Sequence, residues 1–122
     1  MARILIVEDN KNLGLIEAEA LKSQGFQVDF AEDGNSAKNL ILKNNYDVLI
    51  LDILLPHLTG FELAEIAKMR KTRPPKVILL SGITQGTNCS AGQIANTAHA
   101  DAFLSKPLSL KTLIDKVKSL LS

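Results

Sequence analysis

Short runs of apolar residues alternate along this chain with stretches in which apolar residues recur every three or four positions. Four runs are continuously apolar and rich in Ile, Leu and Val, which is typical of strands buried on both faces of a sheet. They are Ile4–Val7, Val48–Leu51, Val77–Leu80 and Ala102–Leu104. A fifth segment, Phe26–Phe30, alternates apolar and polar residues and therefore predicts an edge strand with one solvated face.

The segments between these runs have the periodicity of amphipathic helices. We expect helices over 12–24, 35–44, 61–70 and 109–121, and a poorly held one over 87–98. Gly25 stands where the first helix should stop, and Ser109 stands where the last should begin. The stripes that define the four better helices are Leu13, Ile16, Ala20 and Leu21; Ala37, Leu40 and Ile41; Leu63, Ile66, Ala67 and Arg70; and Leu110, Leu113, Ile114, Val117 and Leu121.

Strands that alternate with helices predict an α/β fold, in which helices cover both faces of a parallel sheet. Because crossovers between parallel strands are right-handed, the five strands should form a doubly wound sheet. The length of 122 residues suits a single domain, 1–122. The polar stretch 82–90 predicts a mobile loop.

Composition excludes several classes of protein. A formal net charge of +1 provides no overall field that would attract nucleic acid or a membrane surface. No apolar run reaches the length of a signal peptide or a membrane span. The one cysteine, Cys89, cannot form an internal disulfide, which fits a reducing compartment. We therefore expect a cytoplasmic protein.

Polar residues follow the buried strands at the points where these strands end. Glu8 and Asp9 follow the first strand, Asp52 and Ser81 follow two later ones, and Lys106 follows the last. Each group alone would be ordinary, since a solvated loop or a turn explains it as well. Together they belong to one edge of a parallel sheet, the carboxyl edge at which open α/β sheets bind ligands.

Three carboxylates in one cleft repel each other unless cations lie among them. Lys106 supplies one positive charge. A hard divalent ion such as Mg²⁺ would supply two more and prefers carboxylate, carbonyl and water oxygens. The cluster therefore predicts a metal site.

In these residues the chain resembles the receiver domain of two-component response regulators, and the resemblance covers almost the whole length. The motifs are the acidic pair in Arg3–Asn10, Asp33-Gly34 with Ala37, Asp47–Pro56 with Gly60, Val77–Ser81, and Ala100–Pro107. The resemblance implies a flavodoxin-like (βα)5 fold with strand order 2-1-3-4-5.

The resemblance also implies a role for each residue of the cluster. Asp52 would take a phosphoryl group from a phosphohistidine and become an aspartyl phosphate. Mg²⁺ would be held by Glu8 (through water), Asp9, Asp52 and the backbone carbonyl of Leu54. Lys106 would neutralise the phosphoryl oxygens, since phosphoryl transfer depends mainly on positioning and electrostatics. The Lys106–Pro107 peptide would be cis and would aim the lysine into the cleft.

The implied output is a shift between two conformations. The Ser81 hydroxyl would move toward the phosphoryl group and Phe103 would follow it, although Phe103 could equally be an ordinary core aromatic. The face made by the fourth helix, fifth strand and fifth helix would change and control a downstream protein, a missing effector domain or a phosphorylation-dependent dimer. The phosphoryl donor would be a sensor histidine kinase or a histidine phosphotransfer protein. No direct contact with nucleic acid or membrane is expected.

Other classes of function fit the sequence less well. The chain would not be an enzyme beyond transfer to, and hydrolysis from, its own Asp52. A phosphatase of the haloacid-dehalogenase type needs a second Asp where Leu54 stands, and a flavodoxin-like cofactor binder would meet repulsion at Glu8-Asp9. A receiver that serves only as a binding module usually lacks one of the residues named above. Leu55 and His99 stand where the family commonly has Met and Gly, and His57 lies beside the cleft. We expect Leu55 to be a replacement of little consequence and both histidines to be solvated.

Overall fold

The computed structural model of this chain describes residues 2–53, 59–69, 73–81, 100–106 and 109–122. Its elements, in chain order, are β1 (Arg3–Val7), α1 (Lys11–Lys22), β2 (Gln27–Ala31), α2 (Gly34–Lys43), β3 (Val48–Asp52), α3 (Gly60–Lys68), β4 (Lys76–Ser81), β5 (Ala102–Ser105) and α5 (Leu110–Leu121). All five predicted strands and four predicted helices are therefore present. The helix expected over 87–98 and the loop expected over 82–90 lie outside the described residues.

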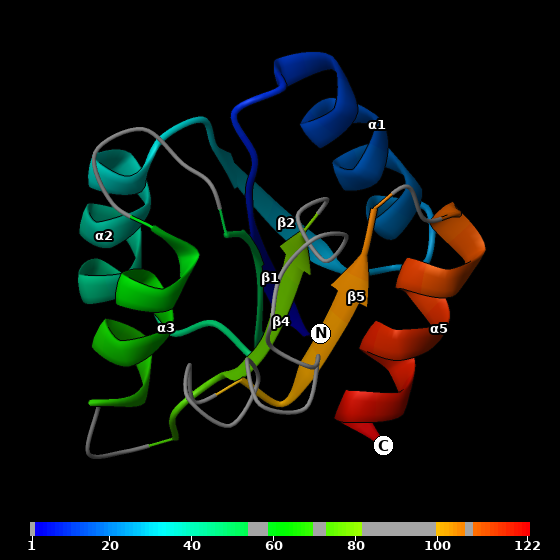
Figure 1. Cartoon of the computed structure of the whole chain (residues 1–122). Coiled ribbons are helices and arrows are strands. Elements are labelled where there is room, and N and C mark those ends of the chain that lie inside the picture. Colours follow the sequence, from blue (N-terminus) through cyan, green and yellow to red (C-terminus); the bar gives the residue numbers. More distant parts are fainter. Residues whose placement is uncertain (1, 54–58, 70–72, 82–99, 107–108) are drawn as a thin grey trace.

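The strands form one sheet in the order β2-β1-β3-β4-β5, and every neighbouring pair is parallel. This confirms the doubly wound α/β fold and the strand order expected from the sequence. Figure 1 shows α1 and α5 on one face of the sheet and α2 and α3 on the other. Among the described residues, no helix is long and apolar enough to cross a membrane.

The continuous apolar runs are explained by two separate cores, one on each face of the sheet. Because successive side chains of a strand point to opposite faces, both faces of a central strand need apolar residues. Leu49 and Leu51 of β3 pack with residues of α2 and α3, whereas Val48 and Ile50 pack with residues of α1 and α5. All four are fully buried.

The buried face of α1 differs from the stripe predicted for it. Leu21 is fully buried as predicted, but Ile16 is 54% exposed, and the other buried positions are Gly14, Glu17 and Ala18. A side chain at Gly14 would overlap the ring of Phe30, so the small residues mark the side on which α1 approaches β2 most closely. The prediction was wrong for Ile16 because it ranked residues by hydrophobicity, while close packing of this helix selected the small residues Gly14 and Ala18.

The ends of the helices are set largely by local hydrogen bonds. Gly25 has a φ of +92°, the left-handed conformation that favours glycine after a helix, so its predicted role is confirmed. The Ser109 hydroxyl accepts a hydrogen bond of 3.1 Å from the Thr112 amide, which confirms the predicted cap of α5. The stripe of α5 is shorter than predicted, because Leu110 and Leu121 at its ends are 37% and 36% exposed. Arg70 of the α3 stripe lies outside the described residues.

Candidate functional site

Three carboxylates meet at the carboxyl edge of the sheet, as the positions of the strand ends predicted. Val7 of β1 is paired with Leu51 of β3, so the residues that follow or end these strands are neighbours. One oxygen from each of Glu8, Asp9 and Asp52 lies within 4.8 Å of the others. Glu8 and Asp52 are only 2% and 7% exposed, which makes the cluster unusual for charged groups.

Lys106 extends from the end of β5 into this cluster. Its ammonium donates hydrogen bonds to Asp52 Oδ2 at 2.8 Å and to both carboxylate oxygens of Glu8 at 2.9 and 3.0 Å. Since β4 separates β5 from β3 in the sheet, the long lysine side chain reaches past the end of a strand to make these contacts. The structure thus brings together residues that are up to 98 positions apart in the sequence.

The backbone of Asp52 is held by the start of α3. A Cβ atom at Gly60 would lie 2.5 Å from the carbonyl oxygen of Asp52, so only glycine allows the helix to approach this closely. The Gly60 amide donates a hydrogen bond of 3.0 Å to the Ile53 carbonyl. Thr59 and Glu62 form a capping box, which fixes the first turn of the helix against the end of β3.

The electrostatics of the cluster follow from burial and mutual contact. Burial raises the pKa of Glu8 to about 7, and the hydrogen bond with Asp52 and the negative charge of Asp52 add to this rise. The Lys106 ammonium opposes it. Burial alone would lower the pKa of Lys106, but its bonds to Asp52 and Glu8 outweigh burial and raise it. The lysine is therefore a permanent cation that partly balances the acidic groups.

The donor set fits a hard divalent cation. Three carboxylates that share a small space, two of them buried, form a nest of negative charge that one ammonium does not neutralise. Carboxylate oxygens are the ligands that Mg²⁺ prefers in proteins. The carbonyl of Leu54, which was expected to complete the set, lies outside the described residues.

Glu17 is a buried acid that the sequence analysis missed. It is 3% exposed, and its Oε1 has no hydrogen-bond partner in the described part of the chain. Burial raises the pKa of its carboxyl, and the charges of Lys106 and Asp52 act on it in opposite directions. The signal was present in the spacing, because Glu17 follows Gly14 by three residues and precedes Leu21 by four.

The remaining predicted residues are only partly described. Ser81 ends β4 and is paired with Ser105, but its side chain lies outside what the structure describes, as does Pro107 of the expected cis peptide. Phe103 is partly buried and packs against the core on the side of α2 and α3. This position fits a core aromatic and leaves its switching role as a prediction.

Comparison with known proteins gives one consistent family. The family model described as the response regulator receiver domain matches residues 4–118. The transcriptional regulatory protein RprY of Bacteroides fragilis is 29% identical over 119 residues, which are 98% of this chain and 49% of that protein. The chain thus spans about half the length of such curated relatives.

Solved structures agree with this result. A two-component response regulator from Clostridium difficile superimposes with a TM-score of 0.85 at 27% identity, over 99% of this chain and 96% of that one. The response regulator TrrA from Thermotoga maritima, solved in complex with Mg²⁺-BeF, gives a TM-score of 0.81 at 36% identity, over 98% of this chain and 99% of that one.

Proposed function

This chain belongs to the response regulator receiver family, the phosphoacceptor signalling domains of two-component systems, and on that premise we propose that Asp52 is its phosphoacceptor. The observation that supports this assignment is the contact of 2.8 Å between Lys106 Nζ and Asp52 Oδ2 inside the acidic nest. Among the described carboxylates of that nest, Asp52 ends a central strand and is held by both Lys106 and the start of α3.

The reaction that we assign to this site is nucleophilic transfer. A carboxylate oxygen of Asp52 attacks the phosphorus of a phosphohistidine, the new P–O bond forms, and the P–N bond to the donor imidazole breaks. Lys106 stays charged throughout and offers its ammonium to the phosphoryl oxygens. Glu8, Asp9, Asp52 and the Leu54 carbonyl would hold Mg²⁺, which supplies positive charge to the same oxygens when bound.

The signalling step is proposed to follow from the added charge at Asp52. A phosphoryl group brings negative charge and acceptor oxygens, to which the Ser81 hydroxyl can donate. Phe103, which is paired with Leu79 two residues before Ser81, would then change its packing and alter the face made by the fourth helix, β5 and α5. The proposed partners are a histidine kinase or histidine phosphotransfer protein as donor, and an effector domain, a downstream protein or a second phosphorylated copy as target. In this proposal the domain acts in the cytoplasm and makes no direct contact with nucleic acid or membrane. It is no enzyme beyond chemistry on its own Asp52. Residues 1–122 form the receiver domain.

Intact mass after treatment with acetyl phosphate and MgCl2 tests the assignment of Asp52. The wild-type chain should gain the mass of one phosphoryl group, and Asp52→Asn should not. Asp115→Asn is the matched control, since Asp115 is an exposed carboxylate on α5 that should leave the gain unchanged. Omission of MgCl2 should prevent the gain in all variants.

A gain of mass that persists in Asp52→Asn would overturn the assignment of the phosphoacceptor. A folded wild-type chain that gains no mass at all would instead favour a receiver that works only as a binding module.

A further inference from the structure

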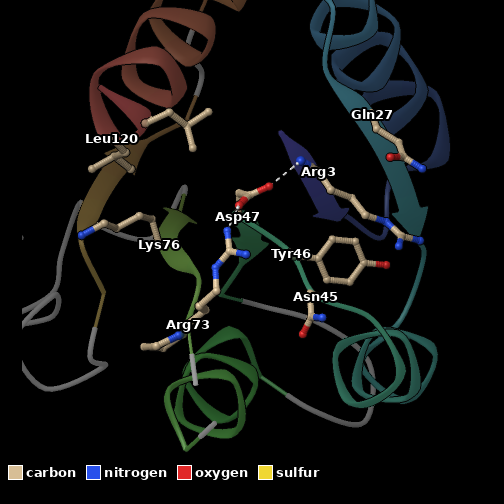
Figure 2. Close-up of a pocket in the computed structure, with 10 residues that line it drawn as sticks. Arg3, Gln27, Asn45, Tyr46, Asp47, Arg73, Lys76 and Leu120 are labelled. Carbon is tan, nitrogen blue, oxygen red and sulfur yellow. Dashed lines mark hydrogen bonds and ion pairs between the residues drawn. The ribbon is translucent and has the colours of Figure 1, made fainter. Parts of the chain in front are cut away.

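A second candidate site lies at the amino edge of the sheet, at the opposite end of the strands from Asp52. A pocket of about 550 Å³ is formed there by the first residues of β1, β2 and β4, the residues before β3, and the end of α5. This volume is in the range of about 300–1,000 Å³ that is typical of small-molecule sites. Figure 2 shows the lining side chains around this pocket.

One wall of the pocket is preformed by a hydrogen-bonded network. Arg3 Nη2 lies 2.9 Å from Asp29 Oδ2, and the Tyr46 hydroxyl donates to the same oxygen at 2.7 Å. The Arg3 guanidinium lies 5.1 Å from the centre of the Tyr46 ring. Asp47 Oδ2 accepts a hydrogen bond of 2.8 Å from the Arg3 amide. The side chains of this wall are therefore held in place before a ligand binds, so binding does not cost the entropy of ordering them.

Positive charge exceeds negative charge around the pocket. Three cations line it, Arg3, Arg73 and Lys76, against one carboxylate, Asp47. Arg3 is matched by Asp29 behind the wall, and Arg73 Nη2 is 3.7 Å from Asp47 Oδ1. The Lys76 ammonium makes no hydrogen bond or ion pair with any residue that the structure describes, although its charge helps to lower the pKa of Asp101. The pocket is therefore complementary to a ligand with a single negative charge, because a second one would be repelled by Asp47.

Arg73 stands at the pocket in an unusual conformation. Its φ of +48° is in the left-handed region, which is unfavourable for a residue with a side chain. Such residues are concentrated at ligand sites, where the conformation serves the placement of a group. The Arg73 side chain is 89% exposed, and its planar guanidinium can bind both oxygens of a carboxylate.

We propose that this pocket binds a small organic carboxylate. The carboxylate pairs with Arg73, and Lys76 supplies a further positive charge at the same edge of the sheet. The apolar body of the ligand packs on Leu121 and on Leu120, which Figure 2 shows on the side formed by α5. The site is separate from the phosphoacceptor cluster, since it lies at the other end of the strands. It does not depend on the function proposed for Asp52.

Amide chemical shifts of the ¹⁵N-labelled chain, recorded without Mg²⁺, test this proposal with three probes at one ionic strength. The probes are 2-naphthoate, which has a ring and a charge, 2-naphthalenemethanol, which lacks the charge, and acetate, which lacks the ring. We expect 2-naphthoate to shift resonances of residues 3, 46–47, 73 and 120–121 in a saturable way. The other two probes should bind at least about tenfold more weakly, since each lacks one half of the match.

Two variants connect the binding to the proposed contacts. Arg73→Gln should weaken 2-naphthoate binding about tenfold. Lys38→Gln, which removes an exposed cation of α2 outside the pocket, should not weaken it. Asp52→Asn should also bind the probe normally, because it changes only the opposite edge. Equal binding of the neutral probe, equal binding by Arg73→Gln, or shifts that map away from the pocket would overturn the proposal.

Discussion

Glu17 provides a sharp test of how this fold tolerates a buried acid. It is 3% exposed, and its Oε1 lacks a hydrogen-bond partner in the described part of the chain. A buried polar group without a partner costs about 1–3 kcal/mol of folding free energy, and a charged one costs more. We therefore expect Glu17→Leu, which has a similar volume, to raise the free energy of unfolding by about 1–3 kcal/mol at pH 8.

The pH dependence separates the charge of Glu17 from its polarity. Burial raises the pKa of this carboxyl above its ordinary value of 4.5, so the folded state binds more protons than the unfolded state just above that pH. The contribution of Glu17 to the free energy of unfolding is therefore most favourable below pH 4.5. This contribution declines as pH rises through the folded-state pKa of Glu17. Glu17→Gln lacks this decline, and its advantage over the wild type should be small at pH 4.5 and grow toward pH 8.

Urea unfolding at several pH values between 4.5 and 8 measures both the gain in stability of the variants and its dependence on pH. Each kcal/mol of change in the free energy of unfolding should also shift the thermal midpoint by roughly 3–6 °C for a chain of this size. Glu19→Gln is the control on the same helix. The Glu19 side chain is 78% exposed, and its ion pair with Lys22 Nζ, at 3.9 Å, lies on the solvated surface. It should change stability by less than about 0.5 kcal/mol. A difference between Glu17→Gln and wild type that is the same at every pH, or a loss of stability in both Glu17 variants, would refute this reasoning.

Two further predictions concern packing and the acidic nest. Gly14→Ala should lower the free energy of unfolding by about 1–3 kcal/mol in urea titrations, because the new methyl group would overlap the Phe30 ring; unchanged stability would show that α1 can move away. Asp52→Asn should lower the pKa of Glu8 from about 7 toward its ordinary 4.5 in the metal-free protein, because Asp52 helps to raise it while Lys106 opposes the rise. A ¹³C NMR titration of the Glu8 carboxyl would measure this, and a value still near 7 would contradict the role given to Asp52.

The site illustrates which parts of a function can be predicted from the order of strands. Glu8, Asp52 and Lys106 were each placed at a strand end by the sequence, and a parallel sheet necessarily collects such ends at one edge. Their contacts, such as the 2.8 Å between Lys106 and Asp52, confirm this placement. The sequence could not show that Gly60 allows α3 to approach the Asp52 carbonyl, because that contact depends on the angle at which the helix packs.

The amino edge could not be predicted in the same way. Tyr46 and Arg73 belong to no motif, and Arg3 only begins the segment that contains the acidic pair. The three residues lie in separate segments, so nothing in their spacing relates them. Their arrangement around one pocket is a result of the order of the strands and of the loop that holds Arg73 with positive φ.

The sequence by itself determined the type and order of the elements, because uninterrupted apolar runs suit strands covered on both faces and three-to-four spacing suits helices. It also determined the edge at which the acidic residues and Lys106 gather. Only the tertiary structure decided which side of α1 faces the sheet, since Gly14 and Ala18 are buried where Ile16 was expected. Hydrophobicity favours burial in general, but the fit of a helix against its neighbours depends on side-chain volume at each contact, and that is fixed only when the elements pack together.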